Sequence, residues 1–181
     1  MRKLIMWNLM TLDGYFEGPN RDIDWHEDVW GDELEQFSLE QGHAAGVLLF
    51  GRITYELMAN YWPSAKGEIA DFMNALPKIV ASRTMDKVDW QNSRLIRENV
   101  PEEIARLKAE SGKDIFIFGS ADLSASLILH GLIDEFRVCV VPIVLGGGSS
   151  LFKACQERLK LRLIDARPLK TGAVILRYQQ E

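Results

Sequence analysis

The sequence has few of the residues that form disulfide cross-links or bind a metal. Its 181 residues include two cysteines and three histidines. Cys139 lies in an apolar run and Cys155 in a polar segment, without C-x-x-C spacing or a nearby histidine pair. A chain of this length buries roughly 70% of its extended surface, so a hydrophobic core suffices for stability. We therefore expect no structural zinc, no disulfide scaffold and no metal in the functional site.

The chain also lacks an excess of positive charge and a long hydrophobic run. Lys and Arg number 21 against 26 Asp and Glu, a net charge of −5. Long-range electrostatics therefore favours neither nucleic acid nor an anionic membrane as partner. No apolar run approaches the ~20 residues that a bilayer span needs, and the N-terminal segment has no small-residue cleavage site. No repeat or linker divides the sequence, so we expect a soluble, cytoplasmic protein with a single domain over residues 1–181.

What the sequence does contain is an alternation of strand and helix patterns. Short apolar runs predict strands at 4–12, 47–50, 78–81, 95–97 and 115–118, and amphipathic patterns predict helices at 32–45, 51–62, 68–75, 102–110 and 122–130. Such an alternation predicts a mostly parallel sheet covered on both faces. Residues 16–31 are expected to form a long functional loop.

The last third of the sequence is richer in strands. Runs at 135–145, 159–166 and 173–179 predict strands, and no helical pattern separates the last two. These two should pair antiparallel around Lys170-Thr171-Gly172. The fold class is therefore α/β, with three α/β/α layers and a mixed sheet that ends in an antiparallel hairpin.

Three segments repeat one arrangement, in which a short apolar strand is followed by Gly or Ser, a hydroxyl or arginine, and a helix or turn. They span residues 47–54, 79–84 and 115–123. Free amides at a helix N-terminus bind phosphate, and glycine lets the phosphate approach the backbone. Three such sites at strand ends predict a phosphate-rich ligand along one sheet edge. The same arrangement is also an ordinary corner of an α/β fold, and neither G-x-x-x-x-G-K-[ST] nor G-x-G-x-x-G occurs.

Five motifs in order resemble the dihydrofolate reductase superfamily, most of all the C-terminal reductase domain of the bifunctional riboflavin-biosynthesis deaminase-reductase. They are Thr11-Leu12-Asp13-Gly14, Gly51-Arg52-Ile53-Thr54-Tyr55-Glu56, Ser82-Arg83-Thr84, Phe118-Gly119-Ser120-Ala121-Asp122-Leu123, and Gly131-Leu132-Ile133-Asp134-Glu135 leading to Pro142-Ile143-Val144-Leu145-Gly146-Gly147-Gly148. The resemblance implies a dihydrofolate-reductase-like fold and an NADPH-dependent reductase. Its implied substrate is a small heterocycle related to 5-amino-6-(5-phosphoribosylamino)uracil. The zinc deaminase signature, H-x-E with P-C-x-x-C, is absent.

The resemblance also implies which residues hold the cofactor. The pyrophosphate would lie at the second helix, the adenosine 2′-phosphate at the Ser-Arg-Thr turn, and the nicotinamide ribose after the central strand. The implied cofactor residues are Gly51, Arg52 and Thr54, then Ser82, Arg83 and Thr84, then Gly119, Ser120, Ala121 and Leu123. An arginine fork and two hydroxyls suit a phosphate dianion, which favours NADPH over NADH. Ser120 stands where the family has the second glycine of a pair.

A reductase also needs an acid or an ordered water to protonate the reduced substrate. The resemblance implies an acidic residue just after the glycine pair, which is Asp122 here. Its alternative role is an N-cap for the following helix. Asp13 is the second candidate, for catalysis and for substrate binding, although with Gly14 it equally suits an ordinary turn.

The remaining candidates for substrate binding are Gly14, Trp25, Gly146 and Gly147. Trp25 could stack on a flat heterocycle or anchor the long loop. Residues 146–148 could touch a substrate phosphate or simply turn the chain. We expect no ligand role for the three histidines, which lack metal-ligand spacing.

Two other functions stay open at this point. One is a dihydrofolate or other pteridine reductase, although Asp32, Glu33 and Glu35 do not reproduce that family's carboxylate pattern. The other is a non-catalytic nucleotide-binding protein of the same fold. We also predict a homodimer, because residues 136–145 and the terminal strands offer more apolar surface than one sheet face needs.

Overall fold

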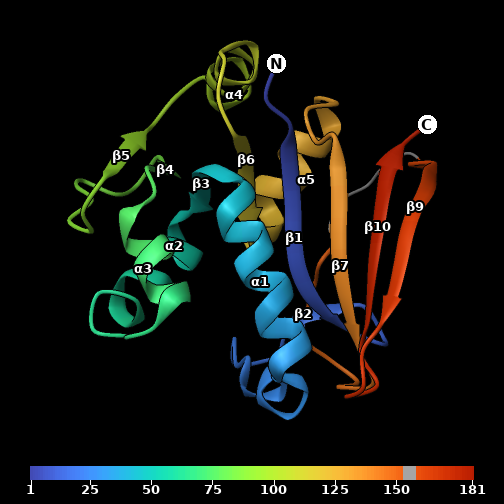
Figure 1. The fold of residues 1–181 in the computed structure, drawn as a ribbon. Helices are drawn as coiled ribbons and strands as arrows, with labels where there is room; N and C mark the ends of the chain where they lie inside the picture. Colours follow the sequence, from blue (N-terminus) through green and yellow to red (C-terminus); the bar gives the residue numbers. More distant parts are fainter. Residues whose placement is uncertain (153–157) are drawn as a thin grey trace.

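The computed structural model in Figure 1 is built around a mixed sheet with helices on both faces. The structure describes residues 1–152 and 158–181, so Cys155 lies outside the described residues. The elements are β1 (Leu4–Thr11), β2 (Tyr15–Glu17), the 3-10 helix η1 (Asp24–Val29), α1 (Asp32–Ala44), β3 (Ala45–Gly51), α2 (Arg52–Tyr61), α3 (Glu68–Ala75), β4 (Lys78–Ala81), β5 (Ser93–Ile96), α4 (Val100–Ala109), β6 (Asp114–Phe118), α5 (Ala121–Leu129), β7 (Glu135–Val141), β8 (Ser149–Ser150), β9 (Leu161–Pro168) and β10 (Val174–Gln180). In the part of the chain that the structure describes, no helix has the length and apolarity to cross a membrane.

The large sheet has eight strands in the order β5-β4-β3-β6-β1-β7-β10-β9. Every neighbouring pair from β5 to β7 is parallel. β10 is antiparallel to both β7 and β9. The predicted parallel sheet with an antiparallel C-terminal hairpin is therefore confirmed.

The strands alternate their side chains between two cores, as the two-residue period of a strand requires. On β1, Ile5 and Trp7 face the core shared with α1, α2 and α3, whereas Leu4 and Met6 face the core shared with α4 and α5. Figure 1 shows α1 in front of the sheet and α5 behind it. The three predicted layers are confirmed: the central parallel strands are buried on both faces, whereas the edge strand β9 is largely exposed.

Two predicted segments differ from the structure. Residues 16–31 are not an irregular loop throughout: β2 pairs with β8, with Tyr15 opposite Ser150, and η1 follows. The predicted strand 135–145 ends at Val141, because Pro142 has no amide hydrogen to continue the ladder. Neither pairing across the chain nor strand length can be deduced from an apolar run alone.

A buried lysine joins α3 to the strands beside it. Lys78 is 1% exposed, and its Nζ donates hydrogen bonds to the carbonyl oxygens of Asn74, Leu76 and Gln91 at 3.0, 2.7 and 3.1 Å. Its Nζ also lies 4.4 Å from the ring centroid of Trp90. Burial lowers the pKa of Lys78 to about 8. The ammonium is held by three carbonyl oxygens, which makes it a structural tie.

Candidate functional site

The carboxyl ends of four parallel strands form one row along the sheet. The register places Gly51 opposite Ala81 and Trp7 opposite Phe118. Parallel α/β sheets bind ligands at this edge, where the helices that follow the strands begin. A cleft of about 1200 Å³ lies there, and it is lined by residues from the ends of β3, β4, β5 and β6, the starts of α2, α4 and α5, the middle of β1, and parts of β2, η1 and α1.

Ser120 ties the two helices that begin at the cleft. It is the N-cap residue of α5, and both it and Gly119 have left-handed backbone, with φ of 59° and 56°. Its Oγ accepts a hydrogen bond from the Gly51 N–H at 2.8 Å and donates to Thr54 Oγ1 at 2.9 Å. Its own N–H donates to Thr54 Oγ1 at 3.0 Å. These bonds hold a non-glycine residue in a left-handed conformation and so offset the cost of that conformation.

Gly119 is required by a close approach as well as by its backbone angle. A Cβ on this residue would lie 2.9 Å from Thr54 Oγ1 and 3.1 Å from Thr54 Cγ2. Its N–H donates a 2.6 Å hydrogen bond to Asn8 Oδ1 on β1. A Cβ on Gly51 would lie 3.3 Å from Ser120 Oγ. The two glycines therefore let α2, α5 and the ends of β3 and β6 pack tightly around the floor of the cleft.

One end of the cleft carries three arginines. Arg52, Arg83 and Arg97 line it, and all three are exposed. Arg52 pairs with Glu56 at 3.1 Å, and Arg97 donates to the Asp86 carbonyl oxygen at 2.8 Å. Among the described residues, no ion pair neutralises Arg83. This end can therefore bind an anion by local charge, although the whole chain is acidic.

The Ser-Arg-Thr turn is organised by its first residue. Ser82 Oγ accepts hydrogen bonds from the N–H groups of Thr84 and Met85, at 3.2 and 3.1 Å. Ser82 and Arg83 line the cleft, whereas Thr84 is exposed outside it. Of the ten residues implied to bind the cofactor, the structure brings nine to one cleft and leaves out Thr84.

The structure separates the two acidic candidates. Asp122 is exposed in the first turn of α5 and lines the cleft, and the N-cap position belongs to Ser120. Asp13 is not among the lining residues. Its carboxylate accepts hydrogen bonds from Thr11 Oγ1 at 2.7 Å and from the Gly146 and Leu145 N–H groups at 2.8 and 3.3 Å. These bonds lower the pKa of Asp13, and the bond from Thr11 has the largest effect. Asp13 thus clamps two distant turns together.

The other substrate candidates also lie outside the lining of the cleft. Trp25 is 6% exposed and packs in the core, with its ring 4.2 Å from that of His26. It anchors the segment, and its neighbours His26 and Trp30 reach the cleft instead. Gly14, Gly146 and Gly147 do not line the cleft either.

Several lining residues were not recognised from the sequence. Those with polar side chains on β1, η1 and α1 are Asn8, His26, Glu27, Ser38 and Gln41. Burial lowers the pKa of His26 to about 4, so its ring is neutral at pH 7. A polar residue inside an apolar strand was the available signal for Asn8. For the others, a helical or irregular segment gave no signal of which side would face a ligand.

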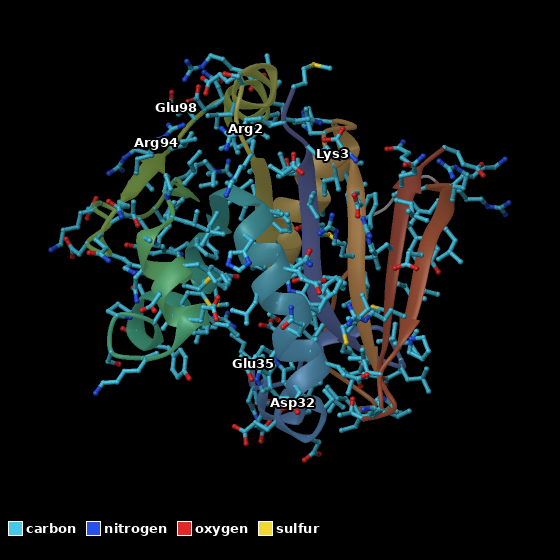
Figure 2. All side chains as sticks on the ribbon, in the orientation of Figure 1. Arg2, Lys3, Asp32, Glu35, Arg94 and Glu98 are labelled. Carbon is cyan, nitrogen blue, oxygen red and sulfur yellow. The ribbon has the colours of Figure 1, made fainter. Side chains whose placement is uncertain are left out.

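The acidic residues of α1 lie away from the cleft. Figure 2 shows Asp32 and Glu35 at the first turn of the helix, at the bottom of the view. Glu33 accepts a hydrogen bond from the Lys170 N–H at 2.6 Å. In contrast, the part of α1 that lines the cleft carries Ser38 and Gln41. Ser38 Oγ donates to the Leu34 carbonyl oxygen at 2.9 Å and Gln41 Nε2 to that of Phe37 at 3.0 Å, so this helix brings buried, neutral side chains to the lining.

Comparison with known proteins identifies the family. The model for the RibD C-terminal domain matches residues 2–175. The chain belongs to the RibD C-terminal domain family. It is 33% identical to the uncharacterized protein YyaP of Bacillus subtilis (strain 168) over 186 residues, covering 98% of this chain and 94% of YyaP.

Solved structures of other RibD-like and reductase proteins share the fold. A candidate riboflavin biosynthesis protein from Shewanella sp. PV-4 superimposes with a TM-score of 0.81 at 22% identity, covering 99% of both chains. Dihydrofolate reductase from Enterococcus faecalis, solved with NADP(H), gives 0.68 at 13% identity, covering 99% of this chain and 96% of that one. The resemblance inferred from the sequence is confirmed, and the findings support a RibD-like reductase.

Proposed function

We propose that this protein is an NADPH-dependent reductase of a small heterocyclic substrate, most like 5-amino-6-(5-phosphoribosylamino)uracil. The observation that carries the proposal is the junction of Ser120, Gly51 and Thr54, which brings the starts of α2 and α5 to one cleft. The first amides of each helix have no partner within the helix and carry the positive end of its dipole. Two such ends beside each other suit the pyrophosphate of a dinucleotide.

The residues present fit this cofactor along the whole row of strand ends. Arg83 follows β4 and Arg97 follows β5, and both strands lie on the side of β3 that faces away from β6. If the pyrophosphate lies between α2 and α5, the 2′-phosphate of an extended cofactor would lie near these two arginines. Arginine binds a phosphate dianion with two parallel hydrogen bonds. The Gly51 N–H is already used by Ser120, so we assign the phosphate contacts to the amides that follow it in α2 and to those that open α5.

When bound, NADPH supplies a hydride for the substrate. We propose that Asp122 holds an ordered water that delivers the proton. Asp122 is exposed, lines the cleft and lies in the first turn of α5, so a water held by its carboxylate would lie in the cleft. Aromatic side chains at the other end of the cleft, Trp30, Tyr61 and Trp62, would exclude water and stack on a flat ring.

Family membership favours the ribosylated pyrimidine over a folate. The chain belongs to the RibD C-terminal domain family, and the acidic residues of α1 lie away from the cleft. The neutral side chains of Ser38, Gln41 and His26 share the lining with the carboxylates of Glu17 and Glu27. We therefore expect turnover with the ribosylated pyrimidine and little or none with dihydrofolate.

The test is a binding titration with NADPH and NADH on the wild type, Arg83→Ala and Arg94→Ala. Arg94 is the matched control, because it is an exposed arginine on β5 that pairs with Glu103 and does not line the cleft. We expect the wild type to prefer NADPH, and Arg83→Ala to lose roughly tenfold or more in NADPH affinity with little change for NADH. Arg94→Ala should behave as the wild type.

Turnover is tested by NADPH oxidation with 5-amino-6-(5-phosphoribosylamino)uracil and with dihydrofolate. Asp122→Asn should lower kcat more than it raises KM, since the carboxylate acts on the proton and not on binding. Absence of binding by either cofactor would overturn the proposal. Binding of NADPH without oxidation of any substrate would instead indicate a nucleotide-binding protein that has lost turnover.

A further inference from the structure

A buried side-chain amide in the floor of the cleft has a hydrogen-bond donor without a partner. Among the described residues, the buried side-chain atoms that make no hydrogen bond are Asn8 Nδ2, Trp25 Nε1, His26 Nε2 and Ser93 Oγ. Asn8 and His26 line the cleft. Leaving a buried donor unpaired costs about 1–3 kcal/mol, so proteins keep such groups where a ligand or a structural partner needs them.

The orientation of the Asn8 amide is determined by its neighbour. Asn8 is 6% exposed and lies on β1 between the apolar residues Trp7 and Leu9. The Gly119 N–H donates to its Oδ1 at 2.6 Å. Because an N–H can donate only to the oxygen of an amide, this bond assigns oxygen and nitrogen without ambiguity. The Nδ2 group is therefore a donor of fixed orientation, buried beneath the surface of the cleft that Asn8 lines.

The position of Asn8 along the row of strand ends indicates what reaches it. The row runs from β4, with Ser82 and Arg83 after it, through β3 and β6 to β1. Three inter-strand spacings separate β4 from β1, about 14 Å. An extended dinucleotide with its 2′-phosphate at Arg83 and its pyrophosphate between α2 and α5 reaches β1 with its nicotinamide. The nicotinamide carries a carboxamide oxygen, an acceptor that matches the Asn8 donor.

We propose that Asn8 Nδ2 binds the carboxamide oxygen of the nicotinamide and so fixes the rotation of that ring in the cleft. This inference rests on the proposed use of NADPH. The same side chain connects two parts of the cofactor site, since its oxygen holds the Gly119 turn while its nitrogen holds the ring. Asn8 is thereby a cofactor-binding residue that cannot be recognised from the apolar pattern of its strand.

The experiment compares two ligands, NADPH and 2′-phospho-ADP-ribose, which keeps the 2′-phosphate, the pyrophosphate and both riboses and lacks only the nicotinamide. Asn8→Asp keeps the oxygen that accepts from Gly119 and replaces the donor with an acceptor. Asn8→Leu is a neutral variant of similar size, which covers the case that a buried carboxylate prevents folding. For each variant the readout is the ratio of the two dissociation constants, because damage to the Gly119 turn weakens both ligands and cancels in the ratio.

We expect both Asn8 variants to raise the ratio of the NADPH to the 2′-phospho-ADP-ribose dissociation constant by roughly tenfold. Ser93→Ala is the control, because Ser93 Oγ is also buried and unpartnered but lies outside the cleft. Its ratio should equal that of the wild type. A ratio unchanged in both Asn8 variants would overturn the inference while leaving NADPH binding intact. Failure of the wild type to bind NADPH at all would overturn the proposed function itself, and this inference with it.

Discussion

Replacing Gly119 by alanine tests the construction of the proposed cofactor site most directly. Gly119 has φ of 56°, and an added Cβ would lie 2.9 Å from Thr54 Oγ1. Real Cβ atoms do not approach so closely, so either the Gly119 turn or the Thr54 side chain must move. Gly131 provides a matched control: its φ is 62°, it follows α5 at an exposed position, and an added Cβ would meet nothing within 4 Å.

The expected costs follow from this difference. Alanine in the left-handed conformation costs about 1–2 kcal/mol, which applies to both variants. Only Gly119→Ala also displaces Thr54, whose Oγ1 accepts two hydrogen bonds from Ser120. Each such bond contributes about 0.5–1.5 kcal/mol. Gly131→Ala should therefore lose about 1–2 kcal/mol of unfolding free energy, and Gly119→Ala about 2–5 kcal/mol.

The assay is urea unfolding of both variants, followed by NADPH titration under conditions where both are folded. NADPH affinity should fall at least about tenfold in Gly119→Ala, because the starts of α2 and α5 no longer meet, and should be unchanged in Gly131→Ala. Equal stability and equal NADPH affinity in the two variants would show that the close approach at Thr54 has no energetic consequence.

Three further predictions concern pH, the buried lysine and assembly. Because folding lowers the pKa of His26 from 6.5 to about 4, the unfolded state takes up a proton first as pH falls. Stability should therefore drop between pH 6.5 and 4, by about 3 kcal/mol at most. Urea midpoints across this range should show the drop in the wild type and less of it in His26→Gln; identical pH profiles would contradict it. Lys78→Met should lower the free energy of unfolding in urea by about 2–4 kcal/mol, since three carbonyl oxygens lose their donor. The exposed control Lys87→Met should change it by no more than about 0.5 kcal/mol. A small loss in both variants would refute the structural role of Lys78. The mass measured by light scattering should be twice 20.6 kDa. Leu163→Glu should lower it toward 20.6 kDa, because β9 is an edge strand on which Leu163 is 50% exposed. A wild-type mass of 20.6 kDa at every concentration would exclude the dimer.

The apolar surface from which we predict a dimer, in residues 136–145 and the terminal strands, is only partly exposed in the structure. The apolar strand β7 lies between β1 and β10, so its surface is covered within the chain. The exposed apolar residues of the terminal hairpin lie on β9. This edge strand is therefore the surface on which we base the prediction.

Local patterns in the sequence determined most of the fold. A two-residue period, helix-forming runs and the positions of glycine and proline act over a few neighbouring residues, so they can be read without knowing the rest of the chain. They predicted α3 and β4 at their observed bounds, and the mostly parallel sheet with its terminal hairpin. The strand-glycine-helix motifs likewise predicted a phosphate-binding edge of the sheet, because a strand end is a local feature. The individual cofactor candidates came from the family resemblance, and nine of them line the cleft.

Tertiary structure alone decided which remaining side chains face the ligand. Asp13 and Trp25 have the chemistry of site residues, but Asp13 is bound to the turn at Leu145 and Gly146, and Trp25 is buried in the core. His26, next to Trp25, lines the cleft instead. Asn8 meets Gly119 across 111 positions of sequence. Such choices depend on contacts between distant segments, and a local pattern cannot specify which of two adjacent polar residues a fold will turn toward its cleft.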